Sequence, residues 1–285
     1  LPALPKRAVI AGAGYIANEF AGIFNELGVE VTLVTRGDKM LRSYDQEIVE
    51  NLVGISREKG IDIRMNFPFK GAQKQADGSI LIDGGDAGTI ETDLLMWAIG
   101  RVPNTSGLGL EDVGVVLDQS GAVVVGADNR TNIESIYAVG DVTNRVQLTP
   151  VAIREGHAFA DSVFGNNPRP IDYICIPTAV FSNPPIAGVG MTEEEARTKL
   201  SDVKVYRSDF RAMKNVLAGR NERALYKMIV DGATDKVVGL HLIGPDSGEI
   251  LQAAAIAVKA GLTKQAFDDT VALHPSMAEE LVLMK

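Results

Sequence analysis

The chain has 285 residues, of which 46% are hydrophobic and 23% charged, and its formal net charge is −9 at pH 7. This length and balance are typical of a globular protein with two or three domains and exclude a disordered chain. The acidic charge argues against nucleic acid or an anionic membrane surface as a partner. No apolar run approaches the ~20 residues that a membrane-spanning helix needs.

The only cysteine is Cys175. One cysteine cannot form an intramolecular disulfide, and the first seven residues lack the apolar core of a signal peptide. Both observations favour a reducing cytoplasm. Because Cys175 lies between two isoleucines, we expect a small buried apolar residue rather than a reactive thiol.

The first hundred residues alternate strand and helix patterns. Short apolar runs indicate buried parallel strands, and apolar residues at helical spacing that end at glycines indicate amphipathic helices. The strand-like runs are 7–11, 29–34 and 94–99, and the helix-like runs are 15–27 and 45–59. Glycine-containing polar segments at 77–79 and 83–86 predict hairpin material. This order predicts an α/β fold with a parallel sheet, Rossmann-like over residues 1–100.

The composition changes at a linker-like stretch, 165–170. Beyond it, three strand-like runs and three helical patterns predict an α+β domain with an antiparallel sheet. The runs are 203–210, 223–230 and 236–243 for strands, and 193–200, 248–260 and 276–283 for helices. A turn at 231–235 joins the last two strands.

The segment Gly12-Ala13-Gly14-Tyr15-Ile16-Ala17 follows the first strand and fits the pattern G-x-G-x-x-A. Gly12 permits a tight turn, Gly14 lets the backbone approach a pyrophosphate, and Ala17 allows the helix to pack closely on the strand. The N–H groups of the first helical turn, Tyr15 and Ile16 among them, then face the phosphates. The segment therefore predicts dinucleotide binding.

The end of the second strand decides which nucleotide is bound. A site for NAD places an acidic residue there, but the sequence has Thr35 followed by Arg36 and, six residues later, Arg42. A guanidinium group stacks on adenine and can donate two parallel hydrogen bonds to phosphate oxygens. Arg36 and Arg42 therefore favour the 2′-phosphate of NADP. The alternative is that these arginines are solvated surface charge.

Taken together, these segments resemble glutathione reductase, within the class I pyridine nucleotide-disulfide oxidoreductases. The stretches 98–104, 137–142 and 148–152 and the C-terminal 274–281 extend the resemblance over the whole chain. It implies an NADP-binding domain at 1–100, the C-terminal part of an FAD-binding domain at 101–166, and an interface domain of a homodimer at 167–285. The implied reaction is the reduction of glutathione disulfide by NADPH through FAD and a cysteine pair.

The resemblance also implies roles for residues near the cofactors. Gly100 and Arg101 are expected beside NADPH, and Tyr15 is expected to be a flap over the flavin. Glu19 is expected to pair with a lysine in a segment that this chain does not contain. Near FAD, Gly140 and Asp141 are expected to bind the ribityl chain, and the backbone of Leu148 and Thr149 to face the isoalloxazine ring.

His274 and Glu279 are the candidate acid–base pair. Reduction of a disulfide needs a proton for the departing sulfur, which a histidine of near-neutral pKa can hold and return. Glu279, five residues later, can orient the ring. The resemblance assigns both residues to a dyad that acts across the dimer; the alternative is a histidine that caps a helix.

The sequence departs from this family in one large respect. The family begins with an FAD-binding β-α-β unit and a Cys-x-x-x-x-Cys motif, and neither occurs here, so we expect a part of a longer protein. His157 stands where some glutathione reductases have a substrate-binding arginine, which leaves another small disulfide open as the substrate. A catalytically silent NADP-binding and dimerisation module is a further alternative. We assign no metal ligands.

Overall fold

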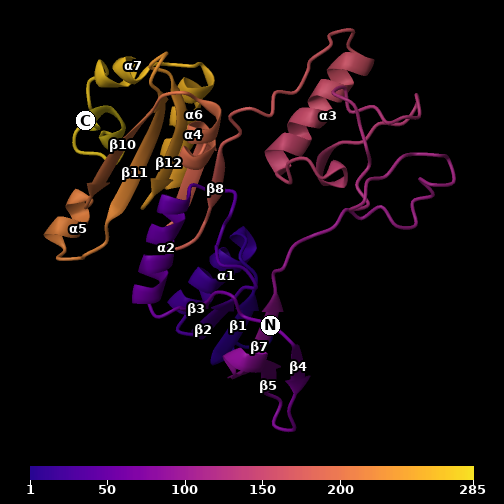
Figure 1. The fold of residues 1–285 in the computed structure, drawn as a ribbon, viewed down its shortest axis with the longest axis vertical. Helices are drawn as coiled ribbons and strands as arrows, with labels where there is room; N and C mark the ends of the chain where they lie inside the picture. Colours follow the sequence, from indigo (N-terminus) through magenta and orange to yellow (C-terminus); the bar gives the residue numbers. More distant parts are fainter. The chain divides into compact units, whose positions relative to one another are not determined.

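A computed structural model describes residues 1–285, which form two compact units. The first unit combines Leu1–Ile99 with Ile174–Lys285, and the second is Gly100–Tyr173. Figure 1 shows the elements of both units in their sequence colours.

A four-stranded parallel sheet forms the N-terminal part of the first unit, in the order β3-β2-β1-β7. Its strands are β1 (Arg7–Ala11), β2 (Glu30–Val34), β3 (Asp62–Arg64) and β7 (Leu94–Trp97). The helices α1 (Tyr15–Glu26) and α2 (Gln46–Glu58) connect successive strands. Apolar side chains from all of them are buried together, as two-sided burial of a parallel sheet requires.

A three-stranded antiparallel sheet is inserted between β3 and β7. It contains β4 (Gly71–Lys74), β5 (Ile80–Asp83) and β6 (Thr89–Thr92), with a short 3-10 turn, η1, at Gly85–Ala87. Its small core joins the parallel sheet through Phe69, whose ring lies 4.7 Å from that of Trp97.

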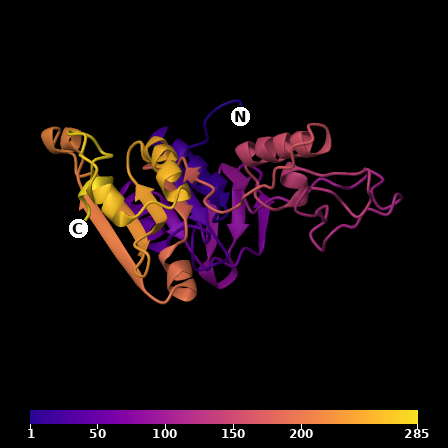
Figure 2. The ribbon, with the colours of Figure 1, turned by 90° about the horizontal axis from the view of Figure 1, so that it is seen from above.

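The C-terminal part of the first unit is built on a five-stranded antiparallel sheet in the order β10-β11-β12-β9-β8. Its strands are β8 (Thr178–Val180), β9 (Ile186–Gly190), β10 (Val203–Phe210), β11 (Ala224–Asp231) and β12 (Val237–Ile243). The helices are α4 (Glu193–Lys199), α5 (Met213–Leu217), α6 (Ser247–Lys259), α7 (Lys264–Asp268) and α8 (Glu280–Leu283). Figure 2 shows the C-terminal segment, in yellow, alongside the orange strands.

One hydrophobic core joins the two parts of the first unit. Val180, Ile186, Leu225 and Ile243 from the antiparallel sheet are buried with the side chains of α1, α2 and the parallel sheet. Figure 1 shows α2 running alongside the antiparallel sheet. The nucleotide-binding part predicted from the sequence and the C-terminal part therefore form one packed body.

The second unit has few regular elements. They are the 3-10 turn η2 (Gly140–Thr143), the helix α3 (Thr149–Val163) and two isolated bridges. Several of its large apolar side chains are exposed, including Leu108 at 62% and Phe164 at 79%.

The structure confirms the α/β class, the parallel sheet and the antiparallel sheet. Two predictions need correction. The helix predicted at 276–283 begins only at Glu280, because side chains of Ser276 and Glu279 form a turn before it. Cys175 is half-buried rather than fully buried. The prediction from the sequence also omitted β3, β8, β9, α3, α5 and α7.

The two units do not test the predicted division at 100 and 166, which stays a prediction. None of the helices combines the length and the apolar character that crossing a membrane requires.

Candidate functional site

The glycine-rich loop lies between β1 and α1. The Gly12 N–H donates to the Val34 carbonyl at 2.9 Å, and a Cβ at Gly12 would lie 2.2 Å from the Ala98 carbonyl oxygen. Ala17 is fully buried and lies 3.3 Å from that same position. Only glycine fits here, because the chain leaving β7 and the helix both press against this residue.

Gly14 has the opposite surroundings. It is the N-cap of α1, and a Cβ there would meet nothing within 4 Å. No side chain caps α1 and its first turn carries no acidic residue. The first N–H groups of a helix need acceptors and carry a partial positive charge. This open, uncapped helix end therefore fits a phosphate of a dinucleotide.

The predicted arginines lie on the loop after β2. Arg36 and Arg42 are both exposed. The Arg42 guanidinium lies over Gly37 and occupies the space that a Cβ at residue 37 would take. Its only ion pair is a loose one with Asp38, at 3.8 Å. The Leu41 N–H donates to the Ala13 carbonyl at 2.8 Å and so ties this loop to the glycine-rich loop. Two exposed cations thus stand on a segment that is bonded directly to the glycine-rich loop.

Tyr15 and Glu19 lie on successive turns of α1. The Tyr15 side chain is 42% exposed, and Ile16 beside it is half-buried. The Glu19 carboxylate accepts a hydrogen bond of 3.0 Å from the Phe181 N–H. The structure therefore gives Glu19 a backbone partner that the sequence did not predict, and this bond links α1 to the segment after β8.

Gly100 and Arg101 open the second unit, and both are exposed. Gly140 and Asp141 begin η2, where Gly140 is buried and the Asp141 side chain is exposed. Leu148 is the N-cap of α3, and Thr149 is its exposed first residue. No side chain caps α3 either. An exposed carboxylate and an uncapped helix end fit a ligand with hydroxyl donors and oxygen or ring-nitrogen acceptors, as FAD has.

A buried hydrogen-bond network that the sequence analysis missed holds Gly140 in place. The Glu155 side chain, 1% exposed, accepts from the Gly140 N–H at 2.5 Å and from the Tyr173 hydroxyl at 2.6 Å. Arg145 donates to the same hydroxyl at 3.1 Å. Burial, and then the adjacent Glu155 carboxylate, raise the pKa of Tyr173. A signal existed in the sequence, because Glu155 shares a helical stripe with the apolar Val151 and Ala158.

The structure brings His274 and Glu279 together. The His274 Nδ1 lies 3.0 Å from the nearer Glu279 carboxylate oxygen, while its side chain is 67% exposed. Glu279 is only 13% exposed, and its carboxylate also accepts from the Ser276 N–H at 3.4 Å. The ring is therefore held at Nδ1, and its Nε2 can exchange a proton with a ligand.

The other two histidines lie elsewhere. His241 is buried, its Nε2 lies 2.9 Å from the Met191 carbonyl, and burial lowers its pKa. His157 is exposed on α3.

Residues 1–156 match the family described as pyridine nucleotide-disulphide oxidoreductase, and residues 176–285 match the dimerisation domain of that family. The chain is 49% identical to a glutathione reductase of Burkholderia cepacia, 47% to one of Nostoc sp. and 45% to the chloroplastic/mitochondrial one of Pisum sativum. These matches cover 99–100% of this chain but only 63%, 64% and 52% of the relatives.

Among solved structures, the chain is similar to the HOCl-induced flavoprotein disulfide reductase RclA of Escherichia coli. The TM-score is 0.92 at 30% sequence identity, and the match covers 100% of this chain and 65% of that chain.

Proposed function

Since this chain belongs to the pyridine nucleotide-disulphide oxidoreductase family, we propose that it is part of an NADPH-dependent enzyme that reduces glutathione disulfide. Residues 1–100 bind NADPH, residues 101–166 complete an FAD-binding domain, and residues 167–285 form the interface of a homodimer. The glutathione reductases with which it aligns are longer, and it spans 63% or 64% of the two bacterial ones. The reaction is therefore assigned to the whole protein, which acts in the cytoplasm.

The pair of His274 and Glu279 is the observation that carries this proposal. Binding of a dinucleotide requires no histidine, whereas reduction of a disulfide requires a proton donor for the departing sulfur. The carboxylate at 3.0 Å from Nδ1 fixes the orientation of the ring. This arrangement leaves Nε2 to hold that proton.

When bound, NADPH and FAD supply the two electrons that reduce the disulfide. The residues of this chain bind, orient and move protons. The open N-terminus of α1 binds the pyrophosphate, Arg36 and Arg42 bind the 2′-phosphate, and Gly100 and Arg101 lie beside the nucleotide. Tyr15 covers the flavin, and Glu19 lies on the following turn of α1.

On the second unit, Asp141 beside Gly140 accepts hydrogen bonds from the flavin's ribityl chain. The N-terminus of α3, at Leu148 and Thr149, faces the isoalloxazine ring. His274 acts on the disulfide of the partner subunit and returns a proton to the thiolate that leaves, so that one disulfide, the two electrons supplied by NADPH and two protons give two thiols.

One observation favours a second candidate, a silent NADPH-binding and dimerisation module. Cys175 is the only cysteine, so the chain by itself has no dithiol. The intact mass and the visible spectrum distinguish the two candidates. A preparation of 30.4 kDa without flavin absorption is the silent module, whereas a heavier flavin-containing protein is the reductase.

Turnover by the whole protein tests the reductase. We expect oxidation of NADPH that depends on glutathione disulfide, and His274→Gln should lower kcat about 100-fold or more. Glu111→Gln, at an exposed position outside the proposed site, is the control for the acid–base role. Rapid NADPH oxidation with another small disulfide and none with glutathione disulfide would correct the substrate, and an unchanged kcat in His274→Gln would contradict the proposed dyad.

A further inference from the structure

The loop that carries Arg42 is fixed at both ends. At its start, Met40 and Leu41 are buried in the main core, and the Leu41 N–H is bonded to the Ala13 carbonyl. At its end, the Asp45 side chain accepts from the Glu47 N–H and caps α2. Gln46 closes the loop further by donating to the Tyr44 carbonyl at 3.0 Å. The position of Arg42, three residues before Asp45, depends on both anchors.

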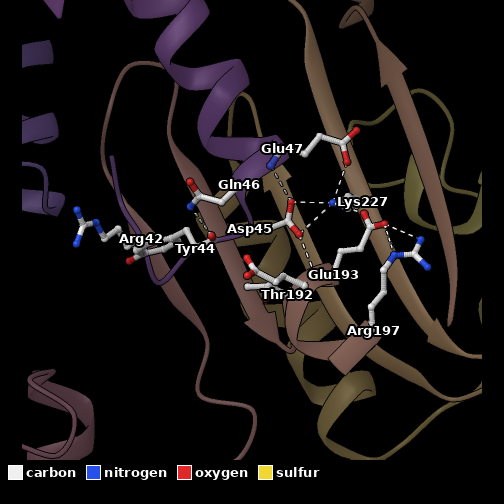
Figure 3. Close-up of a pocket in the computed structure, with 10 residues that line it drawn as sticks. Arg42, Tyr44, Asp45, Gln46, Glu47, Thr192, Glu193, Arg197 and Lys227 are labelled. Atoms are coloured by element: carbon white, nitrogen blue, oxygen red, sulfur yellow. Dashed lines mark hydrogen bonds and ion pairs between the residues drawn. The ribbon is translucent and has the colours of Figure 1, made fainter. Parts of the chain in front are cut away.

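The second anchor is made by the antiparallel sheet, as Figure 3 shows. The Lys227 ammonium on β11 lies 2.8 and 3.0 Å from the two Asp45 carboxylate oxygens. Both side chains are 2% exposed. Asp45 also accepts from the Glu193 N–H, at the start of α4, at 3.1 Å. A residue distant in the sequence thus determines where the loop ends.

Lys227 and the charged side chains around it form a cluster, the Lys227 cluster, in which positive and negative charges balance. Lys227 also lies 2.8 Å from carboxylate oxygens of Glu47 and Glu193. Arg207 pairs with both of these carboxylates, and Arg197 pairs with Glu193. Three carboxylates therefore face three cations. The cluster borders a cavity of about 410 Å³ that Arg42 and Tyr44 also line. None of the carboxylates of the cluster pairs with Arg42.

We propose that Lys227 is a positioning residue for recognition of the nucleotide's 2′-phosphate, because it holds Asp45 and with it the end of the loop that presents Arg42. This inference rests on the proposed binding of NADPH. Without the ammonium, three neighbouring carboxylates repel one another, and a buried charge left unpaired is expensive. Asp45 then moves or takes up a proton, and the end of the loop loosens.

The expected effect is specific to one part of the ligand. The glycine-rich loop is bonded to β2 through the Gly12 N–H and the Val34 carbonyl, and its bond from the Leu41 N–H lies at the first anchor of the Arg42 loop, away from Asp45. Binding of the pyrophosphate therefore persists when Lys227 is lost. Only the contacts to the 2′-phosphate weaken, and a purely structural role for Lys227 does not predict this selectivity.

Calorimetric titration of the chain with NADPH, NADH and 2′,5′-ADP tests the proposal. Lys227→Met should weaken NADPH and 2′,5′-ADP about 10-fold, within the range of coupling through packed networks, and change NADH less than about 2-fold. Lys204→Met, an exposed lysine on the neighbouring β10, is the matched control and should change none of them. Asp45→Asn in the Lys227→Met background should restore NADPH affinity, because the amide still caps α2 without the charge.

The outcomes separate this inference from the proposed function. A wild-type chain that binds NADH as tightly as NADPH refutes the nucleotide assignment and the inference with it. A wild-type preference for NADPH that Lys227→Met leaves unchanged, or an equal loss for all three ligands, overturns the inference alone. If Lys227→Met does not fold, the single variant Asp45→Asn decides: about 3-fold weaker NADPH with unchanged NADH supports the proposal, and unchanged NADPH overturns it.

Discussion

Gly12 and Gly14 are two residues apart, yet their surroundings place opposite demands on a side chain. At Gly12 a Cβ would overlap the Ala98 carbonyl, whereas at Gly14 it would extend into open space. The fold requires the first glycine, and we propose that the second allows a ligand to approach. A sequence pattern shows both glycines in the same way, and only the structure separates their roles.

This contrast predicts different effects for two alanine variants. Gly12→Ala should destabilise the first unit by about 2–4 kcal/mol, because backbone atoms must shift. Gly14→Ala should cost less than about 1 kcal/mol but weaken NADPH about 10-fold, because the new methyl group stands where a phosphate binds. Thermal unfolding and calorimetric titration measure the two effects. Equal melting temperatures for the two variants would contradict this assignment.

Arg36 and Arg42 supply a second prediction at the residue scale. Replacing both by methionine should weaken NADPH about 10- to 100-fold and leave NADH nearly unchanged, since each guanidinium contributes charge-assisted hydrogen bonds only to the 2′-phosphate. Arg220→Met together with Arg223→Met, two exposed arginines beside the antiparallel sheet, is the control for the same change in net charge. An equal loss of both nucleotides would refute the assignment to the 2′-phosphate.

At the scale of elements, η2 depends on α3. Glu155 of α3 accepts from the Gly140 N–H and thereby fixes the turn on which Asp141 is presented. The Thr143 hydroxyl closes the same turn by donating to the Gly140 carbonyl at 2.8 Å. The buried Glu155 carboxylate therefore supports the turn that makes the proposed flavin contact.

Glu155→Ala should destabilise the second unit by about 2–4 kcal/mol, because it leaves the Gly140 N–H and the Tyr173 hydroxyl without their acceptor. Glu155→Gln keeps one acceptor oxygen and should cost less. Glu111→Ala, at an exposed position, is the control. Hydrogen exchange at residues 140–143 reports the effect locally, and unchanged protection there in Glu155→Ala would contradict the predicted support.

At the scale of the whole first unit, the Lys227 cluster joins the parallel and antiparallel sheets. Burial by itself would raise the pKa values of Asp45 and Glu193, but hydrogen bonds from Lys227 hold both below their ordinary values. For Glu47 the hydrogen bond from Arg207 is the main cause of a lowered pKa. Burial opposes the charge of Lys227, but its three carboxylates hold its pKa above 10.5.

These directions fix how stability depends on pH. Carboxylates with lowered pKa values stabilise the fold above their ordinary values, 3.8 for Asp and 4.5 for Glu, and this stability is lost as the pH falls through the lowered values. His241, buried beside Asp45 with a lowered pKa, adds a loss that begins below 6.5. The contribution of Lys227 is complete below pH 10.5 and is lost as the pH rises further.

We therefore expect the melting temperature of the first unit to be highest between about pH 7 and 10 and to fall most steeply below about pH 4. In Lys227→Met the loss below pH 5 should be smaller than in the wild type, because the carboxylates are no longer held in their charged form. Scanning calorimetry at a series of pH values measures both curves. If the melting temperatures of the two proteins fall equally as the pH is lowered, the cluster does not control stability in acid.

The sequence by itself determined the local features. The β-α-β order, the glycine-rich loop and the antiparallel strands follow from hydrophobic period and turn residues, which depend on neighbours in the chain. The pairing of His274 with Glu279 was also predictable, because both lie within a few residues of Pro275. Local patterns could not place the start of α8, since side-chain bonds of Ser276 and Glu279 compete with the helix there.

Only the tertiary structure decided which distant residues meet. In the sequence, Lys227 is one charged residue within a predicted strand. In the structure it is a buried partner of Asp45, 182 residues away. The Glu19 carboxylate likewise accepts a hydrogen bond from the Phe181 N–H, 162 residues away. The physical reason is that the contribution of a buried charge to stability depends on the partners that packing brings to it. The periodicity of the sequence does not identify those partners.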